Sequence, residues 1–139
     1  MKVNYEGGCL CGAVRYQVTA EAMSMRLCWC RDCQYLAAGN ATANVVFPSD
    51  AITITGALSD YVGAADSGNV MHRQFCSICG TPMFSRNEAR PHLIIVRAGT
   101  LDDAERVSPV ATIWTESAPS WACIHQNLPE FPRQPPPAG

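Results

Sequence analysis

Hydrophobic and polar residues alternate over short runs along this chain, which is the pattern of half-buried β-strands. The alternation is clearest at residues 14–18, and it recurs at residues 52–55. Further strands are predicted at residues 45–47, 58–62 and 70–75. Residues 93–96 are continuously apolar, as expected for a strand that is buried on both faces.

The same pattern predicts only one short helix. Asp32 can cap a helix at residues 33–38, and Gly39-Asn40 would end it. Residues 101–104 predict a single isolated turn. Glycine-containing turn signals recur between the strand segments, so we expect a mainly β domain of antiparallel strands.

The length of 139 residues predicts one domain with a hydrophobic core, followed by a tail of different composition. Residues 1–128 are predicted as the folded domain. Residues 129–139 contain five prolines, and we expect them to form an extended, disordered tail.

Charge and hydropathy narrow the range of partners. The net charge of −2 is not the electrostatic signature of a protein that binds nucleic acid or an anionic membrane. The N-terminus lacks the apolar segment of a secretory signal, and no apolar run reaches the ~18 residues of a transmembrane helix. We therefore expect a cytoplasmic protein, where clustered cysteines favour metal binding or catalysis over disulfides. The sequence carries no signal for an oligomeric state.

Seven of the eight cysteines fall into tight clusters. Cys9 and Cys11 precede a predicted strand, whereas Cys76 and Cys79 follow another one. Together these four thiolates can form a closed tetrahedral zinc site, whose affinity for the metal would add to the free energy of folding. The alternative is a set of buried or redox-active cysteines without a metal.

The second cluster, Cys28, Cys30 and Cys33, contains only three sulfurs. A zinc ion bound there would keep one coordination position for a water molecule or a substrate thiol. Cys33 begins the predicted helix, where free backbone N–H groups favour a thiolate. The alternatives are a closed site completed by Cys123 or a histidine, and an iron–sulfur cluster. Cys123 itself lies among apolar residues and is predicted to be buried.

Three segments in this order resemble the glutathione-dependent formaldehyde-activating enzyme family, which shares its domain with the centromere protein V group. The segments are residues 7–16, 75–84 and 98–103, and the cysteine triplet followed by Gln34 lies between the first two. The resemblance implies a β-tent of antiparallel sheets with two zinc ions per chain. It assigns the structural zinc to Cys9, Cys11, Cys76 and Cys79, and the catalytic zinc to Cys28, Cys30 and Cys33.

The resemblance also implies an activity, the condensation of glutathione with formaldehyde to S-(hydroxymethyl)glutathione. This is a carbon–sulfur lyase reaction in reverse, and Cys28, Cys30 and Cys33 would be its catalytic residues. The expected partner is a small thiol such as glutathione. Four arginines are candidates to bind its carboxylates, although a solvated surface charge is the first interpretation of each: Arg26, Arg31, Arg73 and Arg86.

Two positions depart from the family pattern. The family commonly has a histidine where this chain has Trp29, and another near Thr112. Trp29 would make the edge of the second zinc site apolar. Two other functions remain open: a non-catalytic zinc module that binds a partner protein, and a thiol redox enzyme that would use Cys123.

Overall fold

The computed structural model describes residues 4–136, which form ten β-strands, one α-helix and short 3-10 turns. The strands are β1 (Tyr5–Gly8), β2 (Arg15–Val18), β3 (Ser24–Cys28), β4 (Thr42–Pro48), β5 (Ile52–Thr55), β6 (Leu58–Ala64), β7 (Val70–Cys76), β8 (Pro82–Asn87), β9 (Leu93–Arg97) and β10 (Ala111–Ile113). The helix α1 spans Arg31–Leu36. The mainly β fold is therefore as predicted. No helix within residues 4–136 has the length and apolarity needed to span a membrane.

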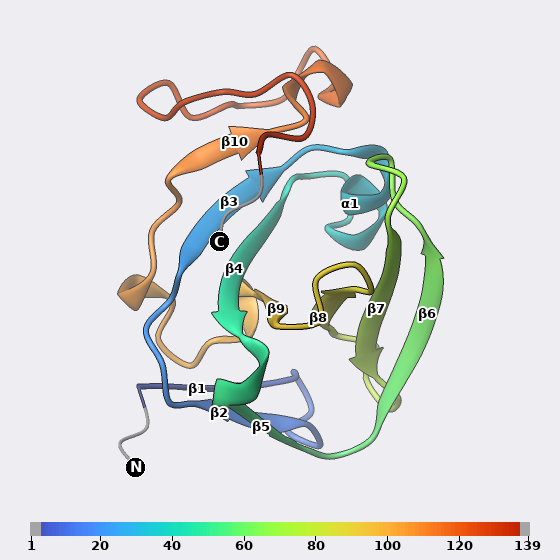
Figure 1. Cartoon of the computed structure of the whole chain (residues 1–139), viewed down its shortest axis with the longest axis vertical. Helices are drawn as coiled ribbons and strands as arrows, with labels where there is room; N and C mark the ends of the chain where they lie inside the picture. Colours follow the sequence, from blue (N-terminus) through green and yellow to red (C-terminus); the bar gives the residue numbers. More distant parts are fainter. Residues whose placement is uncertain (1–3, 137–139) are drawn as a thin grey trace.

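The strands form two sheets. The small sheet has the order β1-β2-β5, and the large sheet has the order β10-β3-β4-β9-β8-β7-β6. Figure 1 shows the small sheet at the bottom, with the strands of the large sheet curving above it. All neighbouring strands pair antiparallel except β10 and β3, which run parallel. This exception to the predicted antiparallel pattern arises because β10 reaches the sheet through a long connection rather than a hairpin.

The hydrophobic core lies between the two sheets. Tyr16 of β2 packs against Phe84 of β8 with ring centroids 5.3 Å apart, and Tyr5 of β1 packs against Phe47 of β4 at 5.1 Å. Each pair joins one sheet to the other through an edge-to-face contact, which adds to the free energy gained by burial.

The large sheet separates this core from a cavity on its other face. Four apolar residues of β4 and β9 are fully buried on the core side: Val45, Phe47, Ile94 and Val96. Side chains alternate along a strand, so the residues between them line the cavity: Asn44, Val46, Ile95 and Arg97. The prediction that residues 93–96 are buried on both faces is therefore only partly right, because Ile95 is half-buried at the cavity.

Helix α1 begins two residues earlier than predicted. Its N-cap is Cys30, whose sulfur accepts a hydrogen bond from the Cys33 N–H at 3.4 Å. Asp32 lies inside the first turn and binds Arg73 at 3.0 Å instead. Capping preferences describe oxygen side chains, so they do not anticipate a sulfur in this position.

Four strands were not predicted, namely β1, β3, β8 and β10. All three residues of β10 are buried, and β8 has three consecutive buried residues, so neither alternates. The turn expected at residues 101–104 is a 3-10 turn at Ala104–Arg106, capped by Asp103. Alternation detects strands with one solvated face, whereas several of these strands are covered on both.

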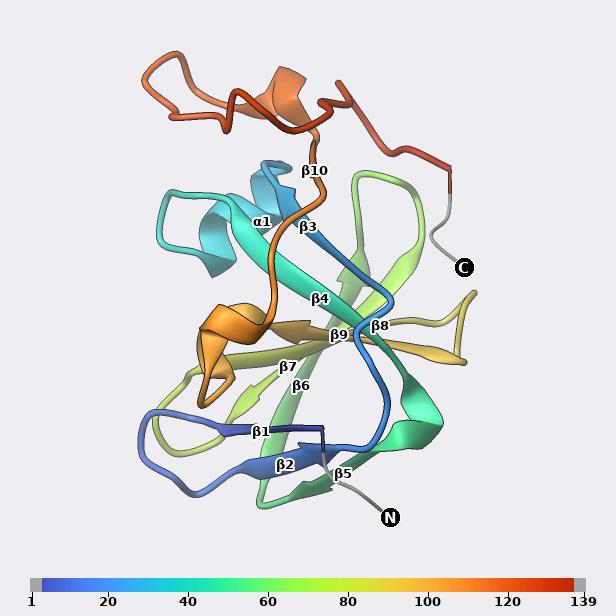
Figure 2. The same ribbon diagram turned by 90° about the vertical axis from the view of Figure 1, so that its left-hand side faces the viewer.

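The C-terminal segment, residues 129–136, lies along β10. The Phe131 N–H donates to the Thr112 carbonyl, and the Thr112 N–H donates to the Pro129 carbonyl, both at 2.9 Å. Figure 2 shows this segment beside β10, on the side of the molecule opposite the small sheet. The expectation of a disordered tail does not describe this segment, because backbone hydrogen bonds tie residues 129–132 to β10 and to Thr115 and Glu116, which follow it. Residues 137–139 of the predicted tail lie outside the described residues.

Candidate metal centres

The four cysteines predicted for the closed site come together from two turns. Cys9 and Cys11 follow β1, and Cys76 and Cys79 join β7 to β8. All four sulfurs lie within 4.8 Å of one another, with Cys9–Cys11 at 3.6 Å and Cys11–Cys76 at 3.8 Å. The edge of a tetrahedron around zinc is about 3.8 Å for Zn–S bonds of about 2.3 Å, whereas a disulfide bond is about 2.0 Å long. The spacing fits a tetrahedral metal ion and excludes a disulfide.

Hydrogen-bond donors surround the sulfurs of this four-cysteine cluster. The Val14 N–H donates to the Cys9 sulfur at 3.3 Å, and the Cys79 N–H donates to the Cys76 sulfur at 3.5 Å. The Thr81 hydroxyl, 3.1 Å from the Cys79 sulfur, and the Thr81 backbone lower the pKa of Cys79 to about 5. Such donors stabilise thiolates, which are the form that binds a metal.

The second cluster combines Cys28 at the end of β3 with Cys30 and Cys33 at the start of α1. These three sulfurs, called the triplet below, lie within 4.8 Å of one another and all are buried. Within residues 4–136 no further cysteine, histidine or carboxylate joins them. Cys123 is exposed, contrary to its predicted burial, because its segment lies on the surface with Trp121 also exposed.

The triplet favours one thiolate strongly. Hydrogen bonds from Cys28 and Cys30, and to a smaller extent the charge of Arg97, lower the pKa of Cys33 to about 2 against the opposing effect of burial. Hydrogen bonds with Cys30 and Cys33, together with burial, raise the pKa of Cys28. A bound divalent cation would offset the repulsion that otherwise prevents three adjacent thiols from ionising together.

The triplet faces the cavity that β4 and β9 line, which has a volume of about 240 Å³. This cavity is rich in positive charge. Four arginines and one acidic residue line it: Arg26, Arg73, Arg90, Arg97 and Asp66. The tip of the β6–β7 hairpin contributes to the wall, as do Gln134 and Pro135 of the C-terminal segment. Three buried sulfurs therefore open onto a space that attracts anions.

Two of the four arginines predicted to bind carboxylates reach this cavity, namely Arg26 and Arg73. Arg31 instead donates to Gln34, and Arg86 donates to Gln74 at 3.2 Å. Sequence analysis missed Arg90 and Arg97. A signal for Arg97 was present, since it is a charged residue at the end of an otherwise apolar strand.

The two positions that depart from the family pattern do not line the cavity. Trp29 is 2% exposed and is absent from the cavity wall, so the predicted apolar edge is not formed by Trp29. Thr112 is fully buried in β10. Trp114 lines the cavity instead, and its indole N–H donates to Gln134 at 3.0 Å.

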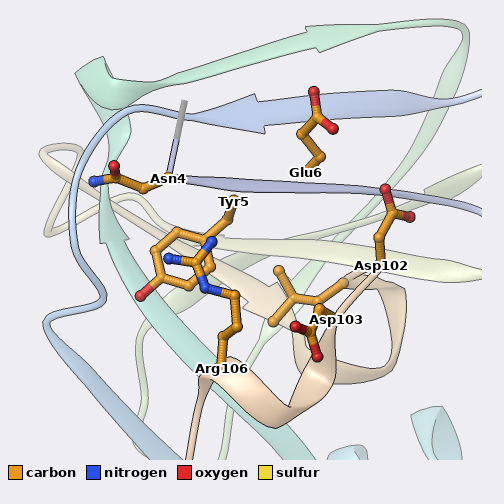
Figure 3. A pocket seen from close by; sticks show the side chains of 7 residues that line it. Asn4, Tyr5, Glu6, Asp102, Asp103 and Arg106 are labelled. Carbon is orange, nitrogen blue, oxygen red and sulfur yellow. The ribbon is translucent and has the colours of Figure 1, made fainter. Parts of the chain in front are cut away.

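A second pocket, of 440 Å³, lies between β1 and the segment that follows β9 (Figure 3). The Arg106 guanidinium lies 4.5 Å from the centre of the Tyr5 ring. Asp102 is paired with Arg15 at 2.6 Å, and Asp103 caps the following turn. The charged groups of this second pocket therefore already have partners within the protein, and the pocket contains no cysteine.

The fold and the two clusters define a class of protein, a small β domain with two cysteine clusters that could each hold a metal ion, one with four sulfurs and one with three. The family model described as glutathione-dependent formaldehyde-activating enzyme matches residues 4–117. The chain therefore belongs to this family, as the resemblance indicated.

Two individual proteins are similar to the chain. A Halomonas elongata protein with the provisional name glutathione-dependent formaldehyde-activating enzyme is 28% identical over 128 residues, which cover 88% of this chain and 82% of that protein. A crystal structure of a Rhodobacter sphaeroides structural genomics target has a TM-score of 0.57 and 22% identity, and the match covers 75% of this chain and 91% of the other. The second likeness supports the fold alone.

Proposed function

We propose that this protein is a zinc-dependent enzyme that joins glutathione, or a similar small thiol, to the carbonyl carbon of formaldehyde. The net reaction is a carbon–sulfur lyase reaction in reverse. The observation that carries the proposal is the position of three buried cysteine sulfurs at a cavity lined by four arginines. Membership of the family supports glutathione and formaldehyde as the first substrates to test.

Two zinc ions per chain fit the clusters. The four-cysteine cluster would hold a structural zinc, because its sulfurs have the spacing of a complete tetrahedron. Cys28, Cys30 and Cys33 would hold the catalytic one. At the triplet, zinc would supply the positive charge that favours a substrate thiol in its thiolate form.

The arginines of the cavity would bind and orient the thiol. Glutathione carries two carboxylates, and guanidinium groups bind carboxylates through paired hydrogen bonds. Arg26, Arg73 and Arg90 come from three different segments around the cavity, so they can contact carboxylates at separate points. Asp66, which lines the same cavity, would attract the ammonium group of glutathione.

The reaction balances without an oxidant or reductant. A bond forms between sulfur and the carbonyl carbon, and the π electrons of the carbonyl move to its oxygen. The proton lost by the thiol is replaced on that oxygen by a proton from water. The residues of the cavity would contribute by holding the thiolate in position for this attack.

Exchange spectroscopy by NMR tests the proposal, because it measures formation of S-(hydroxymethyl)glutathione against the spontaneous reaction. We expect the wild-type protein to accelerate this step and Cys30→Ser to abolish the acceleration. Cys123→Ser is the matched control, since Cys123 is exposed and lies outside both clusters. A wild-type protein that holds two zinc ions and gives no acceleration would overturn the proposal.

The alternative of a non-catalytic zinc module needs a closed second site. Such a site requires a fourth protein ligand, and residues 4–136 place none beside the triplet. Native mass spectrometry with glutathione separates the two functions. An adduct that depends on Cys30 supports the enzyme, whereas two zinc ions without an adduct would support the module.

A further inference from the structure

Arg97, at the end of β9, is a buried cation without a carboxylate partner. Arg97 is 9% exposed, and no ion pair among the described residues includes it. Asn44 and Ser85 accept hydrogen bonds from its two terminal nitrogens. Its Nε has no hydrogen-bond partner within residues 4–136. A buried charge is costly unless an anion offsets it, so the surroundings of Arg97 need one.

The strand register places Arg97 on the same face as the triplet. Asn44 of β4 is paired with Arg26 of β3 on one side and with Arg97 of β9 on the other. Cys28 lies two residues beyond Arg26, so it points to the same side of the sheet. Arg97 and all three sulfurs line the one cavity. Burial lowers the pKa of the Arg97 guanidinium, and the sulfurs of Cys33, Cys28 and Cys30 oppose this effect.

The charge of Arg97 matters most when a further thiol enters. Three thiolates around a divalent cation carry one net negative charge, which a single guanidinium balances. An entering thiolate would add a second negative charge in a site screened from water, where charge interactions are strong. Each terminal nitrogen of Arg97 carries a second N–H besides the one given to Asn44 or Ser85, so the guanidinium can donate to that incoming sulfur without breaking either bond.

We propose that Arg97 binds the sulfur of the substrate thiol in its thiolate form, while Asn44 and Ser85 hold the guanidinium in place. This inference rests on the proposed function and names the group that receives the reacting atom. Arg97 keeps its own proton throughout, and the proton of the thiol leaves to water. The other arginines of the cavity would bind the carboxylates of glutathione.

Thiol binding to the cobalt-substituted protein tests this inference without any aldehyde. Sulfur ligation to Co²⁺ changes its absorption spectrum, so titration with glutathione and with 2-mercaptoethanol gives both affinities. We expect Arg97→Met to weaken the binding of both thiols by a similar factor of about 10 to 100, because the substitution removes a hydrogen bond between charged groups. Arg97→Lys should lose less, because it keeps the charge.

Arg90→Met is the matched control, because Arg90 lines the same cavity and is proposed to bind a carboxylate. This substitution should weaken the binding of glutathione. It should leave unchanged the binding of 2-mercaptoethanol, which has no carboxylate. A loss in Arg97→Met that is confined to glutathione would overturn the inference, as would unchanged affinity for both thiols.

Asn44→Ala and Ser85→Ala keep the test decisive if Arg97→Met fails to fold or to hold cobalt. Each substitution keeps the charge of Arg97 but removes one hydrogen bond that holds its guanidinium in place. The affinities for both thiols should therefore fall together, by less than in Arg97→Met. Unchanged affinities in both variants would contradict the inference. A wild-type protein that binds thiols but does not accelerate the aldehyde reaction would overturn the proposed function and leave the role of Arg97 standing.

Discussion

The four-cysteine cluster lies in two turns near the surface, whereas the triplet is buried beside a cavity. Leu10 and Ile78, which sit between the cysteines of the two turns, are 89% and 75% exposed. The triplet instead has Ile113 in its own buried cluster, with Trp114 and Phe131 packed against it. Both clusters receive backbone N–H groups at sulfur. The difference in the number of sulfurs and in their surroundings supports the proposal that the first cluster has a structural role and the second a chemical one.

The clusters also differ in which parts of the fold they join. The four-cysteine cluster connects the β1–β2 turn of the small sheet to the β7–β8 turn of the large sheet. The triplet joins only the end of β3 to α1, and Gln34 already ties this region by donating to the Trp29 and Ser117 carbonyls at 2.7 and 3.0 Å. Metal loss should therefore cost more stability at the first cluster than at the second.

The largest expected effect is that of Cys76→Ser. Removing this buried ligand should release the structural metal and destabilise the whole domain, because metal affinities of about 10–16 kcal/mol contribute to folding in small zinc domains. Thermal unfolding followed by circular dichroism, together with zinc analysis, measures both consequences. An unchanged melting temperature with two retained zinc ions would remove the distinction between the clusters.

Cys30→Ser should show the opposite balance. We expect the fold and the structural zinc to persist while acceleration of the aldehyde reaction falls by about 100-fold or more, since the metal is needed to activate the thiol. The comparison requires both variants in the same assays. A Cys30→Ser protein as unstable as Cys76→Ser would show that the triplet is structural as well.

Phe131→Ala should affect the triplet alone. Phe131 packs against the buried cluster formed by the triplet and Ile113, so its loss should speed metal release from that site to a chelator by about 10-fold, as for other groups that support metal ligands. Release from the four-cysteine cluster should not change. Arg133→Ala is the control, because its ion pair with Glu116 is exposed and contributes little.

The smallest expected effect concerns His72 on β7, the strand that borders both regions. Its two ring nitrogens lie 2.7 Å from Asp60 and 2.7 Å from Glu88, and these carboxylates, Asp60 first, raise the pKa of His72. The folded-state pKa lies above the unfolded value of about 6.5. The resulting stabilisation is therefore complete below that value and is lost as the pH rises through the raised pKa.

The melting temperatures of wild type and His72→Gln measure this effect at pH 6 and at pH 9. The difference between the two proteins should be larger at pH 6. An NMR titration of His72 gives its pKa directly, and a value at or below 6.5 would contradict the prediction.

The sequence alone was sufficient for the mainly β class and for the membership of both cysteine clusters. Strands with one solvated face alternate, and metal ligands in a turn are close in sequence, so both features leave local patterns. Residues 14–18 and the pair Cys76 and Cys79 are examples. The assignment of zinc to either cluster stays a prediction.

Tertiary structure alone decided what surrounds the triplet. Arg97 and Arg90 reach the cavity, Trp29 is buried without lining it, and Phe131 packs against the buried cluster that contains the triplet. Each of these positions depends on strand register or on contacts between distant segments, such as the pairing of Asn44 with Arg97. A register shift of one residue reverses the direction of every side chain, and local sequence does not determine register. The local sequence therefore determined which cysteines form each cluster, while the tertiary structure determined which charges the triplet faces.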